Sequence, residues 1–288
     1  MSSSKIMNAK KVLVYILCAF LPMIGIGLVI NPAHQILHLA LSAGAMLLPL
    51  LAVIITQLVF KEPVLKGLDI SFNINRWWVI GWLLMPVLAM AVLGATLLMP
   101  GATWAPNNEM MQAVLQSMPE GFGIWGLIGI TLVSGLFSGI SINAIFAFGE
   151  EIGWRGYLMK VLKGRKFLLV ALLIGVIWGF WHAPLILNGH NYPQHPVPGV
   201  FMMVLFCLML TPMLMYFRIK GGSVIVPAIM HGTFNALVGI TNLVVAPFND
   251  LLYGGPGFAG MIVLLVINIC LFIYDRFISK ENIFLSEI

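Results

Sequence analysis

Six ionisable or strongly polar side chains lie inside apolar stretches of this chain. They occur in three short motifs: Glu150, Glu151 and Arg155 in AFGEEIGWRGYL, His182 in GVIWGFWHAPL, and His231 with Asn235 in PAIMHGTFNAL. Hydrolysis of a polar bond needs a base that takes a proton from water, and a desolvated Glu or a His can supply it. It also needs hydrogen-bond donors for the oxyanion, which a His and an Asn one helical turn apart can provide. The residue types therefore indicate hydrolytic chemistry.

The spacing of these residues predicts which of them touch. Residues four apart lie on one face of a helix, about 40° apart around its axis. Three pairs have this spacing and are expected to be in contact: Glu151 with Arg155, Trp178 with His182, and His231 with Asn235. Glu150 points about 100° away from Glu151. We therefore expect Arg155 to neutralise one carboxylate while the other is free to act as a base.

The composition excludes an ordinary water-soluble domain. Of the 288 residues, 60% are hydrophobic and only 9% are charged, with a mean hydropathy of +1.02, whereas soluble domains are about 25% charged. The formal charge is +5, but long apolar runs separate the charges, so the expected partner is the lipid bilayer and not nucleic acid. Cys18, Cys207 and Cys270 lie in apolar segments without a CxxC motif and are interpreted as packing residues.

Eight apolar stretches are long enough, at roughly 17 to 25 residues, to cross about 30 Å of hydrocarbon. They are approximately 12–30, 36–60, 77–100, 124–150, 168–187, 200–217, 224–246 and 259–275. The first is too long for the apolar region of a signal peptide, and we expect it to remain as a span. The prediction is an all-α fold, a polytopic membrane bundle of about eight transmembrane helices that forms a single domain over residues 1–288.

The basic residues predict the orientation of this bundle. When the N-terminus is placed inside, all fifteen Lys and Arg fall on the inner side, with Arg155 counted in the loop after the fourth span. The outer loops near 101–123, 188–199 and 247–258 contain none. We therefore expect an integral membrane protein with both termini in the cytoplasm, in a prokaryotic plasma membrane.

Polar groups inside a membrane are costly unless they share one enclosure. At about 1.5 Å per residue, His182 lies about 21 Å from the inner end of its span and His231 about 10 Å, whereas Glu150 lies close to the inner surface. For these groups to meet, we expect the fourth span to continue past Glu151 toward Lys160 and to be broken in the Gly- and Ser-rich stretch 134–141. The polar side chains should then converge on one cavity that opens toward the cytoplasmic side.

The three motifs, in this order, resemble a known family. They read Glu150-Glu151-x-x-x-Arg155, Trp178-x-x-x-His182 and His231-x-x-x-Asn235. This pattern resembles the CPBP family of CAAX proteases and bacteriocin-processing proteins, which includes the Ras-converting type of CAAX endopeptidase. The resemblance covers about residues 124–246, which we take as the catalytic core. The second motif has Trp178 where the family more often has Phe.

The resemblance implies an intramembrane endopeptidase that hydrolyses a peptide bond of a membrane-associated peptide or protein, with a prenylated CAAX protein as one candidate substrate. In the glutamate-dependent mechanism of the CAAX-type relatives, the residue that matches Glu150 activates water with help from the one that matches His182. His231 and Asn235 then form the oxyanion hole, and Arg155 orients the glutamates. All six motif residues are therefore candidate catalytic residues.

A metal-dependent mechanism stays open beside this one, because the family is also commonly labelled metalloprotease. Glu150, His182 and His231 are the candidate ligands, since two His and a Glu can hold Zn²⁺ and leave a position for water. The sequence has no HExxH helix, which would have favoured the metal strongly.

A non-enzymatic membrane protein is the alternative, either a bacteriocin immunity factor or a small-molecule transporter that uses the same polar cluster for binding. A transporter more often shows two related halves, and none is found. Each motif also has a purely structural interpretation. Glu151 could form only an ion pair, and His182 could hydrogen-bond backbone carbonyls that Pro184 leaves without a partner. His231 and Asn235 could form interhelical hydrogen bonds.

Other features receive structural interpretations. Three GxxxG pairs should mark close helix contacts: Gly135 with Gly139, Gly149 with Gly153, and Gly175 with Gly179. The remaining histidines are assigned to the interface, for His34 and His38, or to solvent, for His190 and His195.

Overall fold

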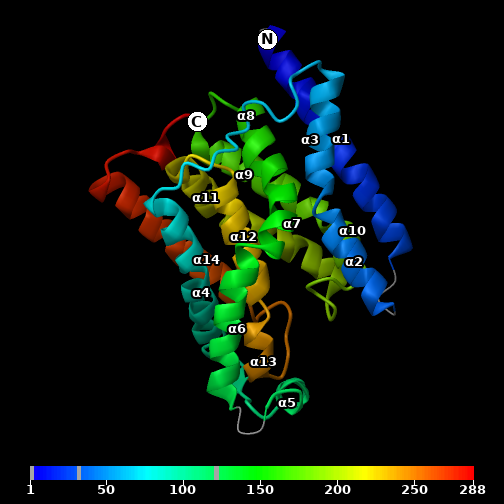
Figure 1. Ribbon diagram of the computed structural model, residues 1–288, viewed down its shortest axis with the longest axis vertical. Coiled ribbons are helices and arrows are strands. Elements are labelled where there is room, and N and C mark those ends of the chain that lie inside the picture. The colour runs from blue at the N-terminus through cyan, green and yellow to red at the C-terminus, as the bar shows by residue number, and fades with distance from the viewer. Residues whose placement is uncertain (1–2, 31–33, 120–122) are drawn as a thin grey trace.

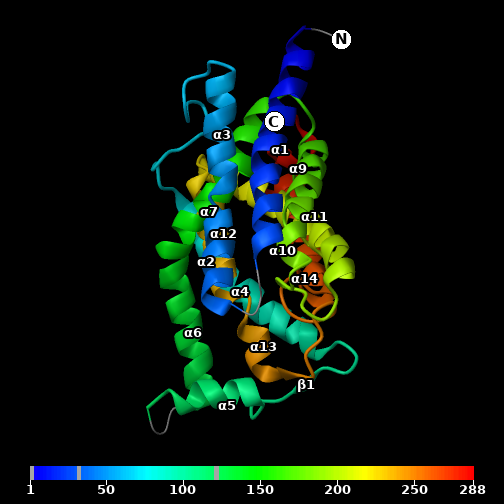
Figure 2. The ribbon, with the colours of Figure 1, turned by 90° about the vertical axis from the view of Figure 1, so that its right-hand side faces the viewer.

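The computed structural model describes residues 3–30, 34–119 and 123–288, which form an elongated bundle of helices (Figures 1 and 2). The α-helices are α1 (Ser3–Val29), α2 (Gln35–Ala45), α3 (Leu48–Val59), α4 (Arg76–Leu97), α5 (Glu109–Gln116), α6 (Ile124–Gly139), α7 (Ile142–Glu151), α8 (Met159–Val161), α9 (Phe167–Trp181), α10 (Ala183–Ile186), α11 (Pro196–Gly221), α12 (Ile225–Leu237), α13 (Ile240–Val244) and α14 (Phe258–Ile273). Two π-helices, η1 (Ile152–Leu158) and η2 (Tyr274–Ile278), continue α7 and α14, and a 3₁₀ turn, η3 (Ile283–Leu285), lies near the C-terminus. The short strands β1 (Thr103–Trp104) and β2 (Val245–Ala246) pair antiparallel.

The predicted all-α membrane bundle is confirmed, but the count of eight spans is not. Among the described residues, six helical stretches are long and apolar enough to cross a membrane, and a seventh results if α6 and the helix from Ile142 to Val161 form one bent span. The stretch predicted over 224–246 is the exception. There α12 has 13 residues and α13 has five, so each is shorter than the roughly 17 residues that a crossing needs.

The fourth predicted span is broken where the sequence suggested. Helices α6 and α7 meet at an angle of 54°, and the break falls at Ile140 and Ser141. The Ser141 hydroxyl donates to the carbonyl of Phe137 at 2.7 Å, and the Ser138 hydroxyl donates to that of Gly135, which is the back-bonding that bends helices. Helix α7 then continues through η1 and α8 beyond Lys160, so Glu150 lies well inside the bundle.

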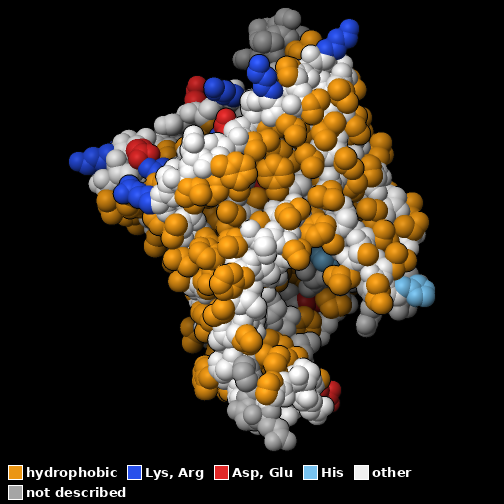
Figure 3. Space-filling view, in the orientation of Figure 1, with side chains coloured by type: hydrophobic (Ala, Val, Ile, Leu, Met, Phe, Trp, Pro, Cys, Tyr) orange, Lys and Arg blue, Asp and Glu red, His pale blue; other side chains and the backbone are white. Residues whose placement is uncertain are grey.

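Both chain ends lie at one end of the bundle (Figure 1), where the blue Lys and Arg side chains of Figure 3 also gather. We call it the basic end. Lys11 and Lys160 both contact Glu62 there, at 2.5 and 3.2 Å. Partial burial raises the pKa of the Glu62 carboxyl, but the hydrogen bonds from the two lysines outweigh burial and bring the pKa below its usual value. Residues far apart in the sequence are thus joined at the basic end.

The opposite end carries α5, α13 and the β1–β2 pair (Figure 2). Its loops are pinned by Asp250, which is 3% exposed and accepts hydrogen bonds from the Gln194 backbone N–H at 2.6 Å and from His195 Nδ1 at 2.7 Å. His195, assigned to solvent from the sequence, keeps 43% of its side chain exposed and also contacts Asp250. A buried carboxylate needs such partners, and this one ties the loop before α11 to the loop before α14.

Glycines mark the closest helix contacts, as predicted. A Cβ at Gly139 of α6 would lie 2.6 Å from the Cα of Thr233 in α12. One at Gly179 of α9 would lie 2.5 Å from the Cα of Val204 in α11, and one at Gly149 of α7 would lie 2.6 Å from the carbonyl oxygen of Met46. Such distances leave no room for a side chain, so these glycines allow α12 to approach α6, α11 to approach α9, and the α2–α3 corner to approach α7.

Candidate active site

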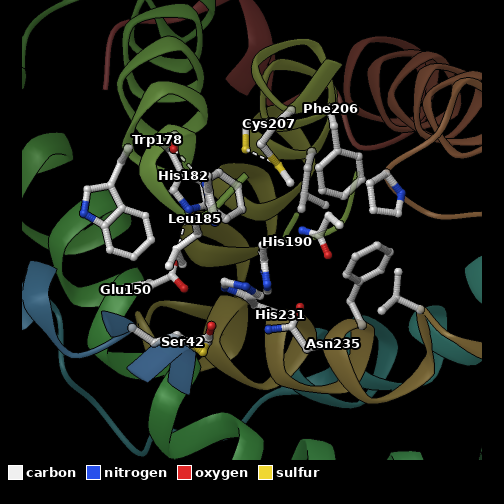
Figure 4. Close-up of a pocket in the computed structure, with 18 of the residues that line it drawn as sticks. Ser42, Glu150, Trp178, His182, Leu185, His190, Phe206, Cys207, His231 and Asn235 are labelled. Atoms are coloured by element: carbon white, nitrogen blue, oxygen red, sulfur yellow. Dashed lines mark hydrogen bonds between the residues drawn. The ribbon is translucent and has the colours of Figure 1, made fainter. Parts of the chain in front are cut away.

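Four of the six predicted site residues line one cavity of about 320 Å³: Glu150, His182, His231 and Asn235. Figure 4 shows Glu150, His182 and His231 pointing toward one another, with Asn235 beside His231. They come from α7, from the residue after α9 and from α12. The convergence expected from the cost of lone polar groups in a membrane is therefore present.

The Glu150 carboxylate is held by two indoles. Its Oε2 accepts a hydrogen bond of 2.7 Å from Trp178 Nε1 and a longer one of 3.4 Å from Trp154 Nε1. The side chain is only 2% exposed. Because both indoles bind the same oxygen, Oε1 is left for other partners in the cavity. Trp154 lies one helical turn after Glu150, just as Arg155 lies one helical turn after Glu151.

Glu151 and Arg155 lie behind the cavity and form the predicted ion pair at 2.9 Å. Both are completely buried, so the assignment of Arg155 to an inner loop was wrong. Its Nη2 donates to Thr211 Oγ1 at 3.0 Å, and its guanidinium stacks 4.2 Å from the centre of the Trp178 ring. A buried charge is tolerated when it is paired and hydrogen-bonded in this way.

The pair is extended by His231, whose Nδ1 lies 3.0 Å from Glu151 Oε1. A carboxylate only accepts hydrogen bonds, so Nδ1 carries the hydrogen and donates. Nε2 of His231 is then the nitrogen available to the cavity. Interhelical bonding, one of the structural roles weighed for His231, is thus present, and it leaves the second nitrogen free for chemistry.

His182 is oriented in the same manner. Its Nδ1 lies 2.9 Å from the carbonyl oxygen of Trp178, an acceptor, so Nδ1 donates and Nε2 is available. The residue follows the last residue of α9, close to Pro184. Both interpretations of His182 therefore apply, because one nitrogen satisfies a carbonyl at the helix end and the other can serve the cavity.

Apolar and aromatic side chains form most of the remaining cavity wall, among them Trp181, Met203 and Phe206. His190 also lines it, which corrects the assignment of this residue to solvent. Burial lowers the pKa of the His190 imidazole to about 4, helped by His38, whose ring centre is 6.3 Å away. His190 is therefore neutral at physiological pH.

The geometry does not fit the zinc site that the sequence left open. Among the residues that the structure describes, no group of three or more His, Cys, Asp and Glu side chains is arranged to hold a metal ion. The chemistry of the site is therefore attributed to its own side chains.

Two contacts were not foreseen from the sequence. The hydrogen bond from Trp154 to Glu150 follows the same four-residue spacing as the pair Glu151–Arg155, so that spacing was an available signal. Thr211 had no such signal, because it lies in the middle of α11. Its contact with Arg155 depends on how two distant helices pack.

Part of the chain is similar to known proteins. Residues 132–237 match the family described as type II CAAX prenyl endopeptidase Rce1-like, and this segment contains all three motifs. A 44-residue stretch is 46% identical to CAAX prenyl protease 2 of Methanococcus maripaludis, and it covers 15% of this chain and 16% of that protein. The resemblance found in the motifs is confirmed for this part of the chain.

Proposed function

We propose that this protein is an intramembrane endopeptidase in which Glu150 is the general base. The observation that carries the proposal is the meeting of Glu150 with His182, His231 and Asn235 around one cavity inside a bundle of apolar helices. The match of residues 132–237 to a family of CAAX endopeptidases supports it.

In the first step, Glu150 Oε1 and His182 Nε2 both accept hydrogen bonds from one water molecule. Glu150 takes a proton as the water oxygen bonds to the scissile carbonyl carbon, and the carbonyl π electrons move to its oxygen. The two indoles keep the carboxylate in place, because Trp178 and Trp154 hold Oε2. A fixed base within reach of the water lowers the entropic cost of the step.

The negative charge on the oxyanion is stabilised from α12. Asn235 offers its amide N–H, and His231 offers Nε2–H when it is protonated, since its Nδ1–H is already given to Glu151. Arg155 holds the Glu151 carboxylate and through it fixes the His231 ring. Both donors belong to α12, so their spacing is set before the substrate binds, which is the arrangement that makes an oxyanion hole effective.

In the second step, the C–N bond breaks and the carbonyl re-forms. Glu150 returns the proton to the leaving nitrogen, so the products are a carboxylic acid and an amine, and the base is regenerated. Since the cavity lies among spans and its wall is mostly apolar, the substrate is a membrane-associated peptide or protein. The names of the matched proteins specify prenyl substrates, and a prenylated CAAX tail is one candidate here.

The test is cleavage of a quenched fluorescent apolar peptide by the purified protein in liposomes. Wild type should cleave it, and Glu150→Gln, which keeps the shape of the side chain but removes its basicity, should reduce turnover at least a hundredfold. Glu109→Gln, at an exposed position before the fourth span, is the matched control and should retain wild-type turnover. Equal turnover of Glu150→Gln and wild type would refute the role of Glu150, and lack of cleavage by wild type would favour a binding protein.

A further inference from the structure

The cavity is closed toward the basic end of the bundle. One turn beyond Glu150, Trp154 and Arg155 are completely buried. Tyr15 of α1 packs edge-on against Trp154, with ring centres 5.7 Å apart, and Thr211 of α11 binds Arg155. Both of these side chains are also completely buried. Four buried side chains from three parts of the chain therefore separate the cavity from the basic end.

The cavity is open toward the other end. Three residues of its wall are exposed, namely Leu39 on α2, Asn191 in the loop before α11, and Asn235 on α12. Pro256, in the loop before α14, also lines it. Figure 3 shows a hollow in this half of the molecule, away from the Lys and Arg side chains and with a His side chain in its depth. The expectation of a cavity that opens at the Lys- and Arg-rich side was wrong.

The position of His182 agrees with this opening. Helix α9 begins at Phe167, directly after Arg165 and Lys166 at the basic end. His182 follows its fifteenth residue, which places it roughly 22 Å along the helix. A hydrocarbon layer is about 30 Å thick, so His182 lies in the half of the bundle far from the basic end.

The charges of the wall restrict what can enter. Among the described residues that line the cavity, Glu150 is the one acid, and no Lys or Arg occurs. A peptide's terminal carboxylate would lose its hydration in this mostly apolar cavity without gaining a Lys or Arg partner, and it would approach the carboxylate of Glu150. An internal segment with uncharged side chains meets neither cost.

We propose that the substrate is an apolar internal peptide segment, and not the C-terminal CAAX tail named above as a candidate, and that it reaches Glu150 from the membrane side opposite to the basic end. With the basic end in the cytoplasm, this is the extracytoplasmic side. The inference rests on the proposed function for the cleavage itself, while the position of the opening is independent of catalysis.

The opening is tested by cysteine accessibility. The background is a variant with Cys18, Cys207 and Cys270 replaced by alanine. Single cysteines are then introduced in the cavity wall, at the opposite end and at the basic end: Ser42→Cys, Asn107→Cys and Asn73→Cys. Intact cells are treated with a small membrane-impermeant cationic methanethiosulfonate, and the thiols that remain are counted after lysis.

Cysteines at positions 42 and 107 should be blocked from outside, and the cysteine at position 73 only after lysis. Three results would overturn the proposal: position 42 reacting only from the side of position 73, position 73 reacting from outside, or position 42 reacting from neither side. Each of these can be read without any cleavage.

The substrate class is tested with apolar peptides that end three residues after the scissile bond, as a free acid and as an amide. The amide should be cleaved at least as fast as the free acid, and a peptide extended on both sides should be cleaved too. Faster cleavage of the free acid would overturn the internal-segment proposal. If wild type cleaves none of the peptides while position 42 is labelled from outside, the proposed function fails and the outward opening stands.

Discussion

Trp178 donates its indole N–H to Oε2 of Glu150 at 2.7 Å and so connects the end of α9 to the end of α7. The same ring lies 5.4 Å from that of His231 and 4.2 Å below the Arg155 guanidinium. A phenylalanine, which the family more often has in this motif, would keep the ring contacts but not the hydrogen bond. In this chain, Trp178 therefore acts as a positioning residue for Glu150.

Trp178→Phe should lower kcat about tenfold and leave KM little changed, because a hydrogen bond to a charged group contributes about 1.5–3 kcal/mol and only part of it is expressed in the rate. Trp181→Phe is the matched control, since Trp181 also lines the cavity but donates to the carbonyl of Ala19. The measurement is peptide cleavage over a range of substrate concentrations. Equal kcat values for the two variants would remove the special role of Trp178.

Glu151→Gln should destabilise the protein, because it leaves Arg155 charged, buried and without its ion pair. Breaking such a pair costs about 3–5 kcal/mol, which a thermal unfolding curve in detergent would show as a clear fall in Tm. Glu62→Gln, at the partly exposed pair with Lys11, should cost about 1 kcal/mol or less. The double variant Glu151→Gln with Arg155→Met should regain part of the lost Tm but not the activity, because an uncharged amide at position 151 no longer stabilises the protonated form of His231.

Asn235→Asp removes the amide donor and places a carboxylate beside the developing oxyanion. Loss of one oxyanion-hole donor typically reduces kcat by about 10²–10³, so a fall of at least that size is expected with an unchanged Tm. Asn107→Asp, at an exposed position of a distant loop, controls for the added charge. Wild-type turnover of Asn235→Asp would mean that the oxyanion is stabilised elsewhere.

Chelators should not change the rate of cleavage, since the described His, Cys, Asp and Glu side chains form no ligand group. The assay compares the purified protein before and after dialysis against a zinc chelator, with a zinc-dependent protease as the positive control. Activity that is lost on dialysis and restored by Zn²⁺ would contradict this expectation and return the metal mechanism to consideration.

A reporter that is active only in the cytoplasm should be active when fused after Ile288. The reason is that the C-terminal residues lie at the basic end, where Ile288 pairs with Gly164 and Arg165, and basic residues are retained on the inner side. The same reporter inserted after Asn107 should be silent. The reverse pattern would invert the bundle and make its cavity open inward.

The amino-acid sequence determined those features that depend on neighbouring residues. Long apolar stretches specify most of the spans, because the hydrocarbon thickness sets their length. A spacing of four residues specifies the contact of Glu151 with Arg155, because it follows from the pitch of one helix. The serines of stretch 134–141 indicate the break before α7, because their hydroxyls compete for backbone carbonyls.

Only the tertiary structure decided how these helices meet. The bend at Ser141 and the approach of α12 to Gly139 bring His231 to Glu151, and no local pattern specifies either angle. The bundle also buries Arg155, which the loop pattern had placed at the surface, and directs the cavity away from the basic end. The burial of a side chain and the direction in which a cavity opens both depend on contacts between segments far apart in the sequence. They are therefore decided only when the bundle packs.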